Sequence, residues 1–171
     1  MSLILHPNGK IEGINNANFN SSMPAGHVIQ VQYSHTTDTD NLATTGIWSS
    51  LDTNITPVST SSSVLVMVTI GLVSSDSSAD VGWDILRDST ALQTGSGGSV
   101  NSTTGAFMNE GNSWAVSSSL VLLDDEISTT SQVTYRVRAA ANSPRTMQVN
   151  RRNSDTSLKT QSRMTLMEIA G

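Results

Sequence analysis

Short apolar runs rich in Val, Ile and Leu recur along the chain, and stretches of Ser, Thr, Gly, Asn and Asp separate them. The clearest alternation lies at 132–140, where Val133, Tyr135, Val137 and Ala139 fall on one side of an extended chain and polar or basic residues fall on the other. A period of two indicates a β-strand with one face in the core and one in water. We therefore expect a strand here that covers one side of a hydrophobic core.

The run from Val64 to Ile70 is apolar at nearly every position, which predicts a strand that is buried on both sides or lies centrally in a sandwich. Residues 34–45 read as a loop. No window keeps apolar residues at helical spacing between caps, so we expect no helix longer than about two turns. Further strands are expected at 27–33, around Ile47 and Trp48, and at 82–87, 106–108, 114–123, 147–150 and 163–169.

Eight or nine short strands with frequent turn signals are typical of an antiparallel sandwich, and jelly rolls are a common double-sheet architecture. A chain of 171 residues fits one domain that buries roughly 70 % of its unfolded surface. The pattern predicts an all-β fold, an antiparallel jelly-roll-like β-sandwich of about eight strands, over residues 27–171. Residues 1–26 are Asn-rich with few apolar positions, and we interpret them as an extended N-terminal attachment arm. The alternative is a terminus without a partner.

The amino-acid composition argues against several classes of function. The net charge is −5, and the nine Lys and Arg residues are mostly scattered, which argues against binding to nucleic acid. There is no Cys, so the chain has no disulfides and no thiolate chemistry. The apolar run in Met1–Pro7 is too short for a signal peptide or a membrane span, so we expect synthesis in a cytoplasm and no membrane partner.

Candidate chemistry is sparse, and we expect no enzymatic activity, no cofactor and no metal. The histidines His6, His27 and His35 all lie in the first 35 residues, whereas a jelly-roll metal site needs ligands that converge from neighbouring strands. Serine is abundant (28 Ser beside 20 Thr), but no Gly-x-Ser-x-Gly elbow is present and no later His could serve as a base.

Two other features have alternative interpretations. Asp124, Asp125 and Glu126 could bind calcium, but three consecutive acids rarely converge, and we expect solvated acids in a turn. Trp48, Trp83 and Trp114 could stack on a sugar, but with seven aromatic residues in the chain we favour a role in the core or at a subunit interface.

Several stretches together resemble a family: the small β-sandwich virion proteins of tailed phages, notably marine and cyanobacterial phages, which occur as head decoration proteins and at the ends of tail or head fibres. The resemblance covers roughly residues 23–170, and the order of the stretches carries it. The matching residues are Met23-Pro24-Ala25-Gly26 before Val28-Ile29-Gln30-Val31; Ile55-Thr56-Pro57 through Ser61-Ser62-Ser63 to Val64-Leu65-Val66; Ile85-Leu86-Arg87-Asp88-Ser89-Thr90; Leu122-Leu123-Asp124 with Ser128-Thr129-Thr130; Thr134-Tyr135-Arg136-Val137; and Met164-Thr165-Leu166-Met167-Glu168-Ile169.

The resemblance implies a trimeric jelly-roll-like protein at the virion surface, with an N-terminal segment that attaches it to the particle. The loop after Leu123 departs from the family in being more acidic and lacking a proline. The chain is short and has no coiled-coil heptads, which favours a capsid decoration or cement protein over a tail or head fibre protein with a receptor- or glycan-binding sandwich.

Two sets of contact residues follow as hypotheses. The arm is expected to bind a phage capsid or tail protein by strand addition or groove filling. The last strand is expected to lie in the core or at the threefold contact of a homotrimer, which would cover sheet edges. The arm residues are Leu3, Ile4, Leu5, Ile11, Ile14 and Phe19, and the last-strand residues are Met164, Leu166, Met167 and Ile169.

Overall fold

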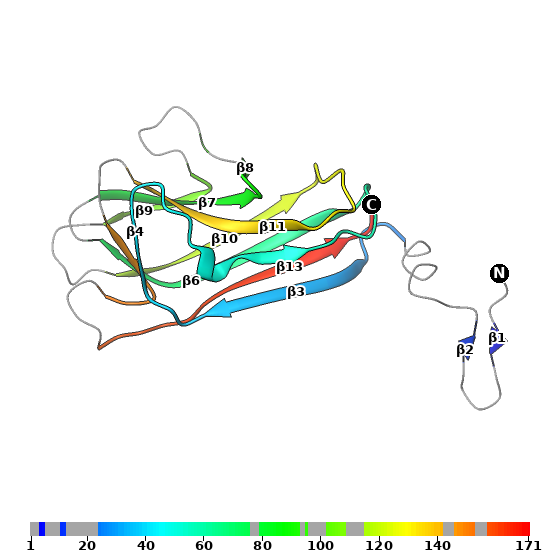
Figure 1. Cartoon of the computed structure of the whole chain (residues 1–171), viewed down its shortest axis with the longest axis horizontal. Coiled ribbons are helices and arrows are strands. Elements are labelled where there is room, and N and C mark those ends of the chain that lie inside the picture. Colours follow the sequence, from blue (N-terminus) through cyan, green and yellow to red (C-terminus); the bar gives the residue numbers. More distant parts are fainter. Residues whose placement is uncertain are drawn as a thin grey trace.

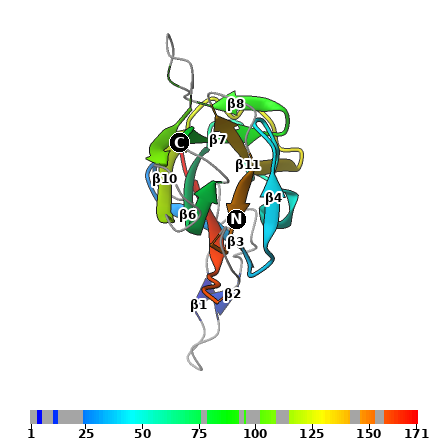
Figure 2. The same cartoon turned by 90° about the vertical axis from the view of Figure 1, so that its left-hand side faces the viewer.

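The protein is a sandwich of two antiparallel sheets that pack face to face (Figures 1 and 2). The computed structural model describes residues 4–5, 11–12, 24–75, 79–92, 95, 102–108, 115–141, 146–152 and 157–171. In the N-terminal segment, β1 (Ile4–Leu5) and β2 (Ile11–Glu12) pair with each other and join neither large sheet.

The first sheet has six strands and the second has five. The first contains β3 (Val28–Thr36), β4 (Asp40–Leu42), β6 (Ser63–Ser75), β10 (Val116–Asp124), β12 (Met147–Val149) and β13 (Ser162–Ile169). The second contains β5 (Thr53–Ile55), β7 (Ala79–Arg87), β8 (Thr90–Leu92), β9 (Thr104–Met108) and β11 (Val133–Ala141).

The strand order is that of a jelly roll. The hairpin β7–β8 is innermost, and the antiparallel pairs β6–β10, β5–β11 and β3–β13 enclose it in turn. Members of successive pairs alternate between the sheets, which is how a long folded hairpin rolls up into two layers. The long strand β6 is central, because β10 lies along one edge while β13 and then β12 lie along the other.

The core lies between the sheets and is built from the alternating apolar positions of both. On β11, Val133, Tyr135, Val137 and Ala139 are buried while the residues between them are partly exposed, as the alternation predicts. Trp48 and Trp83 are also buried in this core.

The expectation of an all-β antiparallel sandwich is confirmed, and the differences from it are local. Residues 34–45 are not all loop, since β4 lies within them. Ile47 makes an isolated bridge to Arg138 rather than belonging to a strand, and the 3-10 helix η1 (Ser49–Leu51) follows it. β4 pairs with β12, and Ile47 pairs with a residue of β11, so both pairings depend on strands that are distant in the sequence.

Candidate assembly surface

The outward side of the first sheet carries the most unusual surface of the described structure. Four strands lie side by side in the order β3, β13, β6 and β10, and residues paired across them project to the same side. Two rows cross this side of the sheet. One row is Val31, Met167, Leu65 and Leu123, and the next is Tyr33, Thr165, Met67 and Val121.

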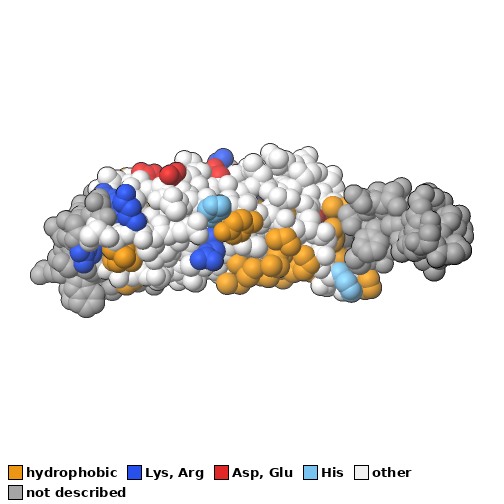
Figure 3. Space-filling view, turned by 90° about the horizontal axis from the view of Figure 1, so that it is seen from below, with side chains coloured by type: hydrophobic (Ala, Val, Ile, Leu, Met, Phe, Trp, Pro, Cys, Tyr) orange, Lys and Arg blue, Asp and Glu red, His pale blue; other side chains and the backbone are white. Residues whose placement is uncertain are grey.

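We call the apolar members of these rows, with Val28 and Ile169 beside them, the outer apolar face. Several of its side chains are open to solvent: Val121 is 65 % exposed, Tyr33 53 % and Val31 51 %. The residues of the outer apolar face are Val28, Val31, Tyr33, Leu65, Met67, Val121, Leu123, Met167 and Ile169. Figure 3 shows hydrophobic side chains gathered on one side of the molecule. Contiguous apolar surface of this kind is a candidate site for interaction with another molecule.

This side of the sheet is almost free of charge. In β3, β6, β10 and β13, Arg163 is the one Lys, Arg, Asp or Glu side chain that faces outward. The two acids of these strands, Glu168 and Asp124, face inward and are buried. The surface therefore fits a neutral, apolar partner better than a polyanion.

The outward side of the second sheet has the opposite character. Arg136 Nε donates a 3.0 Å hydrogen bond to Asp52, and Arg138 pairs with the fully buried carboxylate of Asp84. Burial raises the pKa of Asp52, and the Arg136 guanidinium offsets part of that rise. The Arg136 and Arg138 side chains stay about one-third exposed, so this outer side presents charge to the solvent although Asp84 beneath it is buried. The sandwich is thus one-sided, with one charged and one apolar outer face.

The N-terminal segment joins the sandwich at the end of the sheet where the apolar rows lie. The Gly26 amide donates a 2.7 Å hydrogen bond to the Ala170 carbonyl, and the Ala170 amide donates one of 2.8 Å to His27. Gly26 has a φ of 89°, a conformation that favours glycine. These two bonds hold the entry of the segment against the last residues of the chain (Figure 1).

A buried polar cluster joins the two sheets near the same end. Asp124 accepts a 2.7 Å hydrogen bond from the Tyr135 phenol and bonds of 2.7 and 2.9 Å from Arg87 Nη1. Burial, with the neighbouring Asp124 carboxylate, raises the pKa of Tyr135 above its usual range. Asp124 was expected to be a solvated acid in a turn, and that expectation is wrong because it ends β10 on the inward side. Asp125 and Glu126 are exposed.

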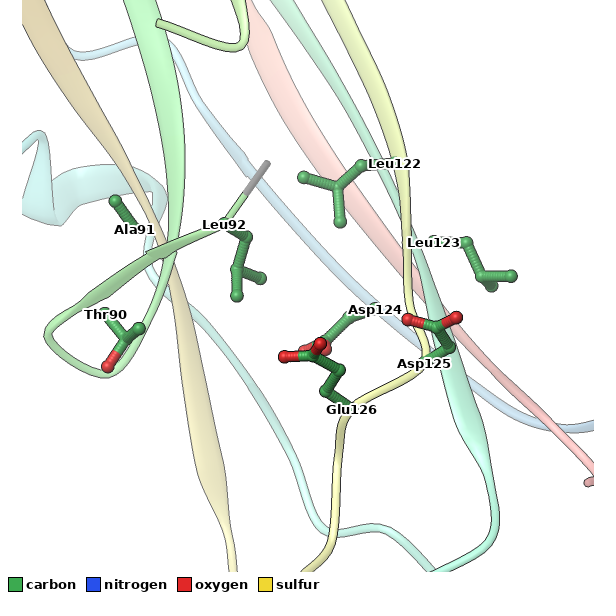
Figure 4. A pocket seen from close by; sticks show the side chains of 8 residues that line it. All are labelled: Thr90, Ala91, Leu92, Leu122, Leu123, Asp124, Asp125 and Glu126. Atoms are coloured by element: carbon green, nitrogen blue, oxygen red, sulfur yellow. The ribbon is translucent and has the colours of Figure 1, made fainter. Parts of the chain in front are cut away.

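A small pocket of about 190 Å³ lies beside this cluster (Figure 4). Leu92 and Leu122 lie on opposite sides of it, and Asp124 and Glu126 are at its edge. The Asp124 carboxylate is occupied by Arg87 and Tyr135, so it is not a free base. Within the described ranges no three His, Asp or Glu side chains are grouped as metal ligands.

The structure places the four last-strand residues that the sequence suggested as core or threefold contacts in two different environments. Met164 and Leu166 are fully buried in the core, whereas Met167 and Ile169 are half-buried on the outer apolar face. Of the arm residues, Ile4, Leu5 and Ile11 fall in the β1–β2 pair, and Leu3, Ile14 and Phe19 lie outside the described residues, as does Trp114. His27 and His35 are exposed, and His6 is not among the described residues.

Sequence reasoning missed most of the outer apolar face, including Val31, Leu65 and Val121. The signal in the sequence is the apolar character of both alternating sets of residues in Val64–Ile70, which predicts burial on both sides or a central position. β6 is central, but its outward side is covered only in part.

The sequence matches no protein-family model and no curated protein. Among the described residues, no helix has the length and apolar character needed to span a membrane.

Proposed function

We propose that this protein is a non-enzymatic structural protein of a tailed-phage virion, namely a homotrimeric capsid decoration or cement protein anchored by its N-terminal segment. The observation that carries this proposal is the outer apolar face, which exposes Val121, Tyr33 and Val31 on an uncharged surface. The resemblance of residues 23–170 to small virion sandwiches supports the same conclusion.

Self-association explains why such a surface would be kept. A sandwich without disulfides that works outside a cell gains kinetic stability when further copies cover its apolar face and its sheet edges. The protein would be made in the host cytoplasm and then occupy the virion surface. The charged outer face of the second sheet suits the side that remains in water.

The N-terminal segment suits attachment to a phage capsid or tail protein. β1 and β2 pair with each other, so the described strands of this segment belong to neither large sheet. A segment that the sandwich does not use for its own sheets is available for a partner.

One observation favours a second function, a fibre protein that binds a host-surface glycan. Tyr33 and His35 stack on the outward side of β3 with ring centroids 5.5 Å apart, and both are exposed. Exposed aromatic faces are the surfaces on which sugars stack. Binding of the chain to a glycan array at micromolar or tighter affinity, lost in Tyr33→Ala, would favour this alternative.

The location of the chain on intact particles tests the proposal. Gold-labelled antibody and cryo-electron microscopy on the phage that encodes the chain should find it in hundreds of copies across the head. A few copies at the tail would support the fibre alternative. Complete absence from purified particles would refute both.

A further inference from the structure

We infer that the outward side of the first sheet carries a binding site for an acidic sugar, one that bears a carboxylate, built from Tyr33, His35 and Arg163. The inference deepens the glycan-binding function given above as the alternative, and it rests on that function. It names the class of sugar and the residue that selects it. Exposed aromatic rings alone leave the class open, because sugars of many kinds stack on them.

Two aromatic rings form the floor of the site. Tyr33 and His35 are two residues apart on β3, so their side chains project to the same side of the strand. Their ring planes stack at 29° to each other, and Tyr33 is 53 % exposed. Among the described strands β3 pairs with β13 alone, so the rings lie at an edge of the sheet. The apolar side of a pyranose ring can lie against such a platform.

Arg163 lies directly across from His35 on the neighbouring strand β13. Opposed residues of an antiparallel pair have Cβ atoms about 5 Å apart, so the guanidinium is within reach of a sugar that covers the rings. Figure 3 shows a histidine beside a basic and a hydrophobic side chain on this side of the molecule. A uronic or sialic acid carries its carboxylate on the rim of the ring, where a guanidinium can bind both oxygens.

Arg163 differs from the other arginines of the two sheets in having no internal partner. Arg87, Arg136 and Arg138 each form an ion pair with an aspartate. The Arg163 side chain is exposed and has neither a hydrogen bond nor an ion pair within the described ranges. Its donors are therefore available to a ligand. One guanidinium selects one carboxylate, which agrees with a side of the sheet that is too poor in charge for a polyanion.

Hydroxyl groups lie beside Arg163 on the same side of the sheet. Thr69 is its cross-strand neighbour on β6, Ser119 follows on β10, and Thr165 is two residues further along β13. Ser119 is exposed, and both threonines are partly exposed. Side-chain hydroxyls donate and accept hydrogen bonds, as the hydroxyls of a sugar do. An apolar partner placed here would leave them unpaired, which costs free energy.

The site lies toward the end of the sheet that is far from the N-terminal junction. The β3–β13 pair runs from Ile169, beside that junction, to Ser162 at the opposite end. The pair of His35 and Arg163 is one residue from the opposite end. A chain attached through its N-terminal segment would hold this pair away from the attachment point. The apolar rows lie nearer the junction, so a contact through them does not have to cover the pair.

NMR titration of the full-length chain at about 0.15 M salt tests the inference. Cellobiouronic acid and cellobiose form a matched pair of probes that differ in one carboxylate, and 3′-sialyllactose and lactose form a second pair. The acidic member of at least one pair should bind at least about tenfold more tightly. Arg163→Gln should remove this preference and leave the affinity for the neutral sugar unchanged. Tyr33→Ala should weaken the binding of both members.

Lys159→Gln is the matched control, because it removes the same charge from an exposed position outside the site. It should keep the preference. Arg163→Thr, a residue that strands favour, is the second variant in case Arg163→Gln fails to fold. A preference that survives the loss of Arg163, or that falls equally in Lys159→Gln, would overturn the inference.

The outcomes also separate the inference from the functions proposed above. Equal binding of acidic and neutral sugars would overturn the inference and leave the glycan-binding function standing. No binding of any of the four sugars would count against both. Neither result would bear on the proposal of a capsid decoration protein, which is tested on particles.

Discussion

The phenol of Tyr135 on β11 donates a 2.7 Å hydrogen bond to the carboxylate of Asp124 on β10, and this bond joins the two sheets across the core. The same carboxylate pairs with Arg87 of β7. Tyr135 is fully buried and Asp124 nearly so. The cluster thus holds the two sheets together at the end of the sandwich where the chain termini lie.

Removing the phenol hydroxyl should weaken the fold without unfolding it. Tyr135→Phe keeps the buried ring and loses one hydrogen bond to a charged acceptor, so we expect a loss of about 1.5–3 kcal/mol in the free energy of unfolding. Urea denaturation followed by circular dichroism measures this loss. Tyr33→Phe is the matched control on the exposed side of β3 and should change the midpoint little.

The same hydroxyl predicts a dependence on alkaline pH. Because the pKa of Tyr135 is raised in the folded protein, its contribution to stability is complete below the unfolded value of about 10 and falls as pH rises above it, by up to ~1.4 kcal/mol per pH unit. Denaturation between pH 8 and 11 should show this slope in the native chain and in Tyr33→Phe. If Tyr135→Phe showed an identical slope, the effect would belong to another group.

Glu168 is a second buried carboxylate whose loss should be costly. It accepts a 2.6 Å hydrogen bond from Gln30 Nε2 and one of 2.8 Å from the Val58 amide. Glu168→Gln places an amide against the amide of Gln30, and we expect a loss of about 1–3 kcal/mol in stability. The exposed Glu126→Gln is the control, and equal midpoints for the two variants would contradict the assigned bonds.

A charge on the outer apolar face should prevent association without harming the fold. Val121 is 65 % exposed in the single chain, so Val121→Lys can be solvated in a monomer but becomes a buried, unpaired charge in an assembly. We expect at least about 100-fold weaker association, or roughly 3 kcal/mol. Sedimentation equilibrium measures it.

The control for Val121→Lys adds the same charge to the other side of the sandwich. Asn54→Lys lies on the exposed outward side of β5 and should leave association unchanged. If both variants dissociated equally, net charge rather than the position of the charge would be responsible, and the outer apolar face would not be the contact.

Deleting residues 1–23 should abolish attachment to the particle and leave the fold of the sandwich intact. The bonds between Gly26, His27 and Ala170 remain, so the melting temperature and the oligomeric state should stay close to those of the full chain. Binding to particles that lack the protein should be lost, as pull-down with purified heads would measure. Retained binding would show that the sandwich itself carries the attachment site.

The local pattern of apolar and polar residues along the chain predicted much of the fold. The alternation at 132–140 corresponds to β11, and the apolar run at 64–70 corresponds to the central part of β6. These segments are readable because side chains on a strand alternate strictly between its two sides. The short strand β4 was missed, since the three residues Asp40, Asn41 and Leu42 are too few to show such an alternation and pair only because β12 lies beside them.

The candidate surface was predicted only in part. Met164 and Met167 look alike in the sequence, yet one is in the core and the other is on the outer apolar face. Asp124 and Asp125 are adjacent acids, and only the first is paired and buried. In each case the distinction depends on which side of its strand a residue occupies and on what the neighbouring sheet places there.

The amino-acid sequence by itself determined that this chain is an all-β, antiparallel sandwich with a distinct N-terminal segment, because strand period, turn residues and composition act locally. The tertiary structure alone decided which strands pair within the jelly roll, and that one outer face is charged while the other is apolar. Strand order joins residues far apart in the chain, and which apolar residues stay exposed depends on how many layers cover each sheet.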